Sequence, residues 1–400
     1  MPPKIPIPGT NINNPIEKNN QNTIEGLKKQ NNPFDLLKAQ KTAEAIQLFA
    51  FEQSGNFYNS MSGKNTGLIP NVDYIYKKAG DFSDLKKVMQ KKLDDFWASD
   101  DGKKISNQIE SFSKKNPDVL ETDYDPQIVT KPLIRSEGWL HYVSNYMADP
   151  SSKRMNQPQA EHGESKYRIY FSPKSEDSFK VFFDVINELN KDTILQKKGF
   201  KAKTLDWFGS KQGTDAYIRI FNQKDKMVFY FTSEETVNRA IEVLQKYGEN
   251  NRSQFSESEI FFGQPIFDKK GAEISGIVIT DHPSGMTPPG LPCIQNGGYQ
   301  TFNDMQASII ENTLIIFIND FINKDINYLE KQTWFKQIKP IYEKLRAIST
   351  KPRNGFDKKD LKAIFSDPNG MYFVKSVLIK NYPEVAKKFG VSENNTAFKK

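Results

Sequence analysis

Hydrophobic and polar positions follow a helical period at both ends of the chain and a strand period in the middle. Residues 33–125 are predicted to be helical, because apolar positions recur at helical spacing in NPFDLLKAQKTAEAIQLFAFEQSG and in FSDLKKVMQKKLDDFWASDDG. Residues 323–400 contain further stretches of this kind, and their last ten residues, which include SENNTAFKK, are expected to fray. Residues 1–32 are rich in Asn, Pro and Lys, which predicts a disordered tail.

The middle of the chain, residues 126–322, alternates apolar and polar positions in short runs that are typical of half-buried strands. The predicted strands are SKYRIYFS, Phe200–Leu205, Asp215–Phe221, 226–232 and 273–280. The predicted helices are EDSFKVFFDVINELNK, 233–248 and 303–322. This order predicts an α+β fold with a mostly antiparallel sheet and packed helices, flanked by N- and C-terminal helical regions.

Composition sets broad limits on the class of protein. The 400 residues are 37% hydrophobic, which is enough for a sizeable core in two or three domains. Cys293 is the single cysteine, which excludes an intrachain disulfide and fits a reducing compartment. No apolar run approaches the roughly 20 residues of a membrane span, and the first residues lack a hydrophobic segment of the signal-peptide type. We therefore expect a soluble protein whose export, if any, uses no cleaved signal.

The net charge and the short motifs disfavour several classes of function. The formal net charge of +7 is a mild excess, and the lysines are scattered, so nucleic-acid binding is disfavoured. The absence of a P-loop and of a Gly-x-Gly-x-x-Gly fingerprint disfavours nucleotide-hydrolysing and Rossmann enzymes. His141, His162 and His282 lack metal-ligand spacing, so no metal site is predicted. His141 is interpreted as a half-buried structural residue and His162 as an exposed one.

Three predicted strands each offer cations on one side. Alternate residues of a strand point to opposite faces, so the residues of one side can be read from the sequence. On the cationic side lie Lys166, Arg168 and Tyr170, then Lys201 and Lys203, then Tyr217 and Arg219, with Lys211 in a nearby loop. No acidic residue shares this side, which favours an anion site, since Arg offers bidentate contacts to phosphate. The alternative is the ordinary charged outer face of a half-exposed sheet.

Such a cluster changes the chemistry of its lysines. A Lys that lies among other cations and is partly desolvated has a lowered pKa and can act as a general base. Beside a bound phosphate, a neutral Lys can take a weakly acidic C–H proton while the phosphate leaves, which is a β-elimination. His282 is a further candidate, because it follows a predicted strand and opens the long Pro- and Gly-rich loop DHPSGMTPPGLPCIQNGG.

The run KYRIYFSP…FKVFFDVINEL…FKAKTLDWFGSKQGTDAYIRIF, followed by DHPSGMTPPGLP and YQTFNDMQASII, resembles the HopA-type effector domain of bacterial type III secretion over about residues 130–320. Relatives of that domain are lyases in lanthipeptide biosynthesis. The run is also distantly similar to the OspF/SpvC phosphothreonine lyases, which eliminate phosphate from phosphothreonine in host kinases and need no metal or organic cofactor. The resemblance implies a secreted effector that acts on host phosphoproteins in the host cytosol.

The resemblance also implies roles for individual residues. The central motif of the lyases is Lys-x-Lys on a strand, and Lys201 and Lys203 match it. Lys203 would then be the base, and Lys201 would lie beside the phosphate or the enolate-like intermediate. Tyr217 and Arg219 are similar to a later Tyr-x-Lys that contacts substrate and phosphate, with Arg in place of Lys.

Two positions depart from the lyase pattern. Arg168 stands where the lyases carry their general-acid His, and an Arg cannot donate its proton usefully because its pKa is too high, although it can bind a phosphate oxygen. Asn303 stands where the lyases carry a phosphate-binding Arg. His282, His162 or Tyr217 would then have to supply the acid.

The favoured hypothesis is a secreted bacterial effector with a cofactor-free phosphothreonine or phosphoserine lyase activity. Its predicted catalytic residues are Lys203, Lys201, Tyr217 and His282, and its predicted phosphate-binding residues are Arg168, Arg219, Lys166, Lys211 and Asn303. The alternative is a catalytically inactive module that binds a phosphorylated or acidic partner through the same face. A third hypothesis, nucleic-acid binding through the basic surface, predicts an affinity that falls steeply with salt.

Overall fold

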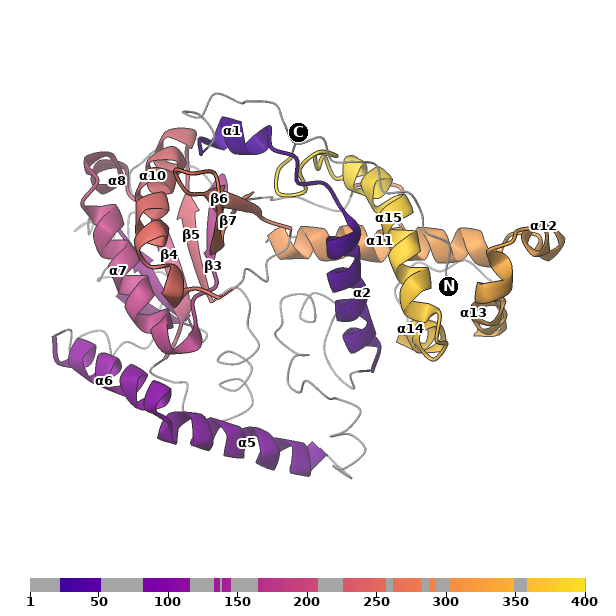
Figure 1. Cartoon of the computed structure of the whole chain (residues 1–400), viewed down its shortest axis with the longest axis horizontal. Helices are drawn as coiled ribbons and strands as arrows, with labels where there is room; N and C mark the ends of the chain where they lie inside the picture. Colours follow the sequence, from indigo (N-terminus) through magenta and orange to yellow (C-terminus); the bar gives the residue numbers. More distant parts are fainter. Residues whose placement is uncertain are drawn as a thin grey trace, which may run out of the picture.

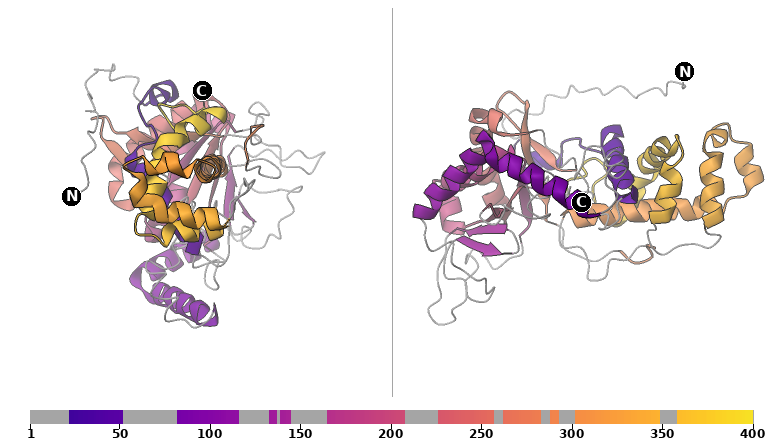
Figure 2. Two further views of the ribbon diagram at one scale, coloured as in Figure 1. Left: turned by 90° about the vertical axis from the view of Figure 1, so that its right-hand side faces the viewer. Right: turned by 90° about the horizontal axis from the view of Figure 1, so that it is seen from below.

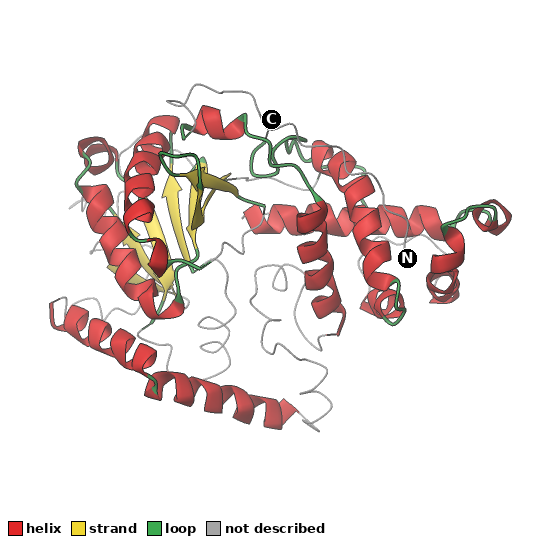
Figure 3. Ribbon diagram, viewed as in Figure 1, coloured by secondary structure: helices red, strands yellow, loops and turns green. Residues whose placement is uncertain are grey.

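A computed structural model of the chain describes residues 22–51, 82–115, 133–136, 139–144, 165–207, 226–256, 262–282, 288–292, 302–348 and 358–399. These residues form one lobe around a β-sheet and a second lobe of helices beside it (Figure 1). The buried apolar residues fall into two large clusters that correspond to these lobes. The predicted α+β fold is confirmed (Figure 3). Among the described helices, none combines the length and the apolar character needed to cross a membrane.

The described strands form one antiparallel sheet. They are β1 (Leu133–Ser136), β2 (Trp139–Val143), β3 (Tyr167–Phe171), β4 (Lys201–Leu205), β5 (Met227–Phe231), β6 (Gln264–Phe267) and β7 (Glu273–Asp281). Their order is β1-β2-β4-β5-β3-β7-β6, and each neighbouring pair is antiparallel. The predicted strand Asp215–Phe221 lies outside the described residues. The hairpin of β1 and β2 was not predicted from the sequence.

Helices cover one face of this sheet (Figure 1). They are α7 (Ser178–Asn190), α8 (Thr193–Lys198) and α10 (Glu234–Asn250), with short 3-10 turns at Ser175–Asp177 and Arg252–Gln254. The strand residues that face these helices, among them Phe171, Phe229 and Phe231, are fully buried. Each of these strands therefore leaves its alternate residues for the opposite face of the sheet.

The second lobe is built around a long helix that is buried along most of its length. Its helices are α2 (Leu36–Phe51), α11 (Phe302–Ile322), α12 (Ile326–Glu330), α13 (Phe335–Ile348), α14 (Lys358–Phe365) and α15 (Gly370–Lys388). We expected α11 to belong with the strands and α2 to belong to a separate N-terminal region. The buried residues of both helices instead lie in one cluster with α13, α14 and α15. The predicted boundaries, at residues 125/126 and 322/323, thus assign helices that pack together to different regions.

A bent pair of helices, α5 (Phe82–Ala98) and α6 (Asp100–Lys115), lies at one end of the sheet lobe (Figure 1). Leu93 and Ile105 from this pair share a buried cluster with Trp207, just beyond β4. Gly102 lies in the first turn of α6. A methyl group on Gly102 would lie 2.2 Å from the carbonyl oxygen of Phe96, so the corner between the two helices leaves no room for a side chain there.

Gly102→Ala is expected to destabilise the protein by about 1–3 kcal/mol, as overpacking does elsewhere. The added Cβ would press on the backbone of α5, which can yield only by opening the corner. The measurement is urea unfolding followed by circular dichroism. Ala ordinarily stabilises a helix relative to Gly by about 1 kcal/mol, so a higher midpoint in Gly102→Ala would contradict the prediction. Asn107→Ala, at an exposed position of α6, serves as the control that should not lose stability.

The predicted disordered tail is wrong for residues 22–32. This segment contains α1 (Ile24–Lys28), whose Ile and Leu side chains are buried in the core of the sheet lobe. The side-chain amide of Asn22 donates to the carbonyl oxygen of Phe267 (2.6 Å) and accepts from its backbone N–H (3.1 Å). The segment therefore covers backbone groups at the edge strand β6, which would otherwise need other partners. Residues 1–21 lie outside the described part of the chain.

The expectation that the last residues fray is also wrong for residues 391–399. Ala397 and Phe398 are buried in the core of the sheet lobe. The carbonyl oxygen of Ala397 accepts from the backbone N–H of Asp281 (3.0 Å), and the backbone N–H of Lys399 donates to the Asp281 carboxylate (2.7 Å). The polar composition of this stretch reflects its hydrogen bonds to other segments.

Residues 22–34 and 391–399 bind to each other, and we call the pair the terminal clasp. The backbone N–H of Thr396 donates to the carbonyl oxygen of Asn32 (3.0 Å) in a short parallel bridge. The buried Asn395 side-chain amide donates to two carbonyl oxygens of the first segment (3.0 and 3.1 Å) and to a glutamine of β6 (2.9 Å). The clasp thus joins segments that lie far apart in the sequence.

Candidate anion-binding site

Cationic residues from two strands meet on the face of the sheet that lies opposite α7 and α10. Lys201 on β4 pairs with Tyr230 on β5, which in turn pairs with Arg168 on β3. Directly paired residues point to the same face, so these three side chains form a cross-strand row that we call the cationic row. Lys201 and Arg168 are two strand spacings, about 10 Å, apart at the backbone. Their long side chains can therefore converge on one anion above Tyr230.

Arg168 is the most buried member of the row, with 6% of its surface exposed. Its guanidinium carbon lies 5.0 Å from the centre of the Tyr230 ring, and a terminal N–H donates to the Tyr170 hydroxyl at 3.5 Å. The Nε–H donates to Nδ1 of His282. These contacts hold the guanidinium in place on the sheet, and a guanidinium offers several N–H donors that suit an anionic ligand.

β7 brings His282 to the row. The backbone N–H of His282 donates to the carbonyl oxygen of Lys166 (2.7 Å), which continues the pairing of β7 with β3. Burial, and then the charges of Arg168 and Lys399, lower the pKa of His282 from 6.5 to about 4. The imidazole is therefore neutral at pH 7, in agreement with an Nδ1 that accepts a hydrogen bond from Arg168.

A second group of residues lies beside the cationic row. Lys203, two residues from Lys201, shares its face, and its Nζ lies 4.3 Å from the centre of the Trp139 ring. His141 on β2 pairs with Lys203. Burial, and then the charge of Lys203, lower the pKa of His141 from 6.5 to about 4. Burial also lowers the pKa of Lys201.

Sequence reasoning missed His141 as a site residue. It is half-buried, as expected, but it points to the same face as both lysines of β4. The alternation in WLHYV places Trp139, His141 and Val143 on one face, which is a signal that the sequence offered. Assigning the stretch to a strand would have put this histidine among the candidates.

The described strands bring no carboxylate to this face around the row. The residues there are Trp139, His141, Val143, Lys201, Lys203, Val228, Tyr230, Arg168, Tyr170, Val278 and Thr280. Asp281 points to the other face, where its carboxylate accepts from the backbone of Lys399. Among the described strand residues, the row is therefore bordered by cationic, aromatic, apolar and hydroxyl-bearing side chains.

The other predicted site residues lie apart from the row or outside the described chain. Lys166 is exposed and precedes β3, at the edge where His282 enters. Asn303 lies in the first turn of α11, and the described contacts do not join it to Arg168. Tyr217, Arg219 and Lys211 lie outside the described residues. Of the predicted set, the structure thus brings Arg168, Lys201, Lys203 and His282 to one face, and it places Lys166 at the rim.

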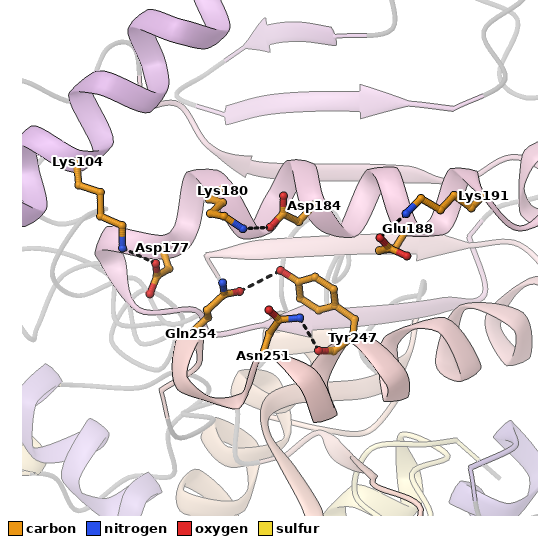
Figure 4. A network of polar contacts seen from close by, with 9 residues as sticks. All are labelled: Lys104, Asp177, Lys180, Asp184, Glu188, Lys191, Tyr247, Asn251 and Gln254. Atoms are coloured by element: carbon orange, nitrogen blue, oxygen red, sulfur yellow. Dashed lines mark hydrogen bonds and ion pairs between the residues drawn. The ribbon is translucent and has the colours of Figure 1, made fainter.

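A groove of about 1070 Å³ lies on the outer surface between α7 and α10 (Figure 4). Its acidic residues are paired: Glu188 with Lys191 at 2.6 Å, Asp184 with Lys180, and Asp192 with Arg239 at 2.6 Å. Burial, followed by nearby carboxylates, raises the pKa of Tyr247. Among the described residues, no group of His, Cys, Asp and Glu is arranged to hold a metal ion. The acidic side chains of the groove are therefore already neutralised by ion pairs. The cationic row is the stronger candidate for a functional site.

The cationic row can do two things chemically. Arg168 and Lys201 can neutralise a phosphate monoester dianion, and an amine with a lowered pKa can accept a proton beside it. The two neutral histidines can become proton donors once an anion raises their pKa values.

Comparison of the chain with protein-family models and with curated proteins finds no match, so its function has to be inferred from this geometry.

Proposed function

We propose that the cationic row binds the phosphate of a phosphothreonine or phosphoserine side chain and that the site eliminates this phosphate without a cofactor. The observation that carries the proposal is the row itself, in which Arg168 and Lys201 flank Tyr230 with His282 bound to Arg168. The resemblance to HopA-type domains supports a bacterial effector that is secreted without a cleaved signal and acts on host phosphoproteins in the host cytosol.

In the proposed reaction, phosphate oxygens bind to Arg168 and Lys201. Lys203, once it has given up its own proton, removes the proton on Cα of the phosphorylated residue, and the C–H electron pair becomes the Cα–Cβ double bond. The Cβ–O bond breaks and its electrons leave with the phosphate, which takes a proton from His141 or His282. The products are a dehydroamino acid and inorganic phosphate. A bound dianion prepares the acid, because it raises the pKa of a nearby imidazole.

The test is mass spectrometry of phosphothreonine and phosphoserine peptides incubated with the full chain without added metal. The expected product has lost phosphoric acid and captures a thiol at the new double bond. Lys203→Ala should lower the rate at least about a hundredfold, the usual contribution of a general base. Lys246→Ala removes an exposed lysine from α10, behind the sheet, and should leave the rate unchanged.

Two results would reject the mechanism. Regenerated Thr or Ser would show a phosphatase, because elimination cannot restore the hydroxyl group. An unchanged rate in Lys203→Ala would remove Lys203 as the base, and the same comparison with Lys201→Ala would then show whether the amine with the lowered pKa takes its place.

A second candidate function is phosphate-dependent binding without chemistry. One observation favours it: His282 is neutral and accepts from Arg168 through Nδ1, so its remaining proton, on Nε2, is too weakly acidic to protonate the leaving group. This candidate predicts that phosphopeptides bind, that Arg168→Met abolishes the binding, and that no product forms. Calorimetry on the peptides of the mass-spectrometric assay separates the two functions.

A further inference from the structure

The helical lobe ends in a short corner, residues 323–340, which contains α12 and the start of α13. Figures 1 and 2 place it at the end of the molecule that lies farthest from the sheet. The corner is rigid, because Leu329 and Phe335 are buried in the core of the lobe and the hydroxyl of Tyr342 donates to the carbonyl oxygen of Lys324 (3.2 Å). Side chains on its outer surface are thus held in place by the fold.

Two large aromatic side chains project from this corner into solvent. Tyr328 is 57% exposed and Trp334 is 48% exposed. The other tryptophans of the chain are half-buried or buried, at Trp97, Trp139 and Trp207. Trp and Tyr have an apolar body and a polar tip, and they are enriched where proteins meet the headgroup region of a membrane.

The charges around these aromatic residues are mainly positive. Lys324, Lys331 and Lys336 are exposed, and in the described part of the chain no carboxylate lies within ion-pair distance of them. The two acidic residues of the corner are engaged: Asp325 accepts from the backbone N–H at the start of α12, and Glu330 pairs with Lys339 at 2.7 Å. The corner therefore presents lysines and aromatic rings together.

We propose that the corner binds to the surface of an anionic membrane. Tyr328 and Trp334 would enter the headgroup region, and the lysines would contact negatively charged lipids. Charge complementarity favours this partner. The convex, protruding shape of the corner favours a membrane over a protein, because strong protein hot spots are residues that fill pockets within a broad interface. The proposal is independent of the function assigned to the cationic row.

The test uses the full chain with vesicles of phosphatidylcholine alone and of phosphatidylcholine mixed with phosphatidylserine. The protein should sediment with the mixed vesicles only, less so at high salt, and its tryptophan emission should shift to shorter wavelength. Replacing Lys324, Lys331 and Lys336 by Gln should weaken the partition about a hundredfold, at roughly a fivefold loss for each lysine near the surface. Tyr328→Ala with Trp334→Ala should abolish the emission shift.

Matched controls exist on α15, whose outer face carries the same kinds of side chain. Tyr372 is 54% exposed, and Tyr372→Ala should bind as the wild type does. Replacing Lys375, Lys380 and Lys388 by Gln changes the net charge equally and should weaken the partition only slightly. Equal losses in the two lysine triples would overturn the proposal, because binding would then follow net charge alone. Equal binding to both kinds of vesicle, or an emission shift that persists without Trp334, would overturn it as well.

Discussion

The protein is expected to lose stability as the pH falls from 6.5 to 4, because two of its histidines stay neutral in the folded state. In the unfolded chain a histidine takes up a proton near pH 6.5, whereas His141 and His282 take it up only near pH 4 in the fold. The unfolded state therefore binds more protons within this window, so stability rises with pH there and levels off above it. His141 thus contributes up to about 3 kcal/mol to the pH dependence of the free energy of unfolding, and the more exposed His282 contributes less, because solvent screens part of the effect.

The charged groups that hold these pKa values low are Lys203 beside His141, and Arg168 and Lys399 beside His282. Asp281 acts in the opposite direction, because burial raises its pKa and folding then favours its protonated form. The net pH dependence of the wild type mixes these effects. The difference in free energy of unfolding between the wild type and each single variant, measured across the pH range, isolates the contribution of one histidine.

The measurement is urea unfolding across this range of pH for the wild type, His141→Gln and His282→Gln. Each variant should lose less stability than the wild type between pH 6.5 and 4, since glutamine takes up no proton. Lys246→Gln, a substitution on the exposed side of α10, should follow the wild type. Curves of identical shape in all four proteins would show that the two histidines titrate normally in the fold.

The terminal clasp is the second place where a large effect is expected. Phe398→Ala should lower the free energy of unfolding by about 3–5 kcal/mol, the range for a phenylalanine removed from a core. Phe398 is 2% exposed and lies in the core cluster of the sheet lobe. Asn395→Ala should cost about 1–3 kcal/mol, because buried carbonyl oxygens of the first segment lose their donor.

Both clasp variants can be measured by urea unfolding at neutral pH. Tyr372→Ala removes an exposed aromatic side chain from α15 and should change the free energy by no more than about 0.5 kcal/mol. A similarly small change in Phe398→Ala would mean that the sheet lobe holds together without the clasp. A destabilised protein whose two lobes melt in separate transitions would show that the clasp couples them.

Local patterns in the sequence predict helices and strands well where the residues of a single segment determine its secondary structure. The α+β class, the antiparallel strands and the start of a helix near residue 233 follow from alternation and turn chemistry, and the structure places the cap of α10 at Ser233. The sequence predicts that this helix ends at Gly248, but α10 continues to Asn250. A methyl group on Gly248 would lie 2.6 Å from a side-chain atom of Ile274, so this glycine allows the helix to approach the sheet. Contacts between distant segments were required to see this.

The candidate site shows the same division between local and long-range information. The faces of Arg168, Lys201 and Lys203 follow from the period of a strand. That β5 lies between β3 and β4, so that Tyr230 separates the two cations, depends on the order of strands in the sheet. The contact of His282 with Arg168 depends on β7 as the other neighbour of β3. The alternation of residues within a single strand predicts neither the order of the strands nor the contact of His282 with Arg168.

The terminal clasp also has a consequence for how the protein is made. Asn395 contacts Leu27 across 368 positions of the sequence, so during translation the first segment leaves the ribosome long before its partner is synthesised. Until Ala397 and Phe398 have been synthesised, the core of the sheet lobe is incomplete. The sheet lobe therefore remains incompletely folded until these residues have left the ribosome, a state in which exposed apolar surface attracts chaperones. Completion of the sheet-lobe core should consequently wait until residues 395–398 have been synthesised.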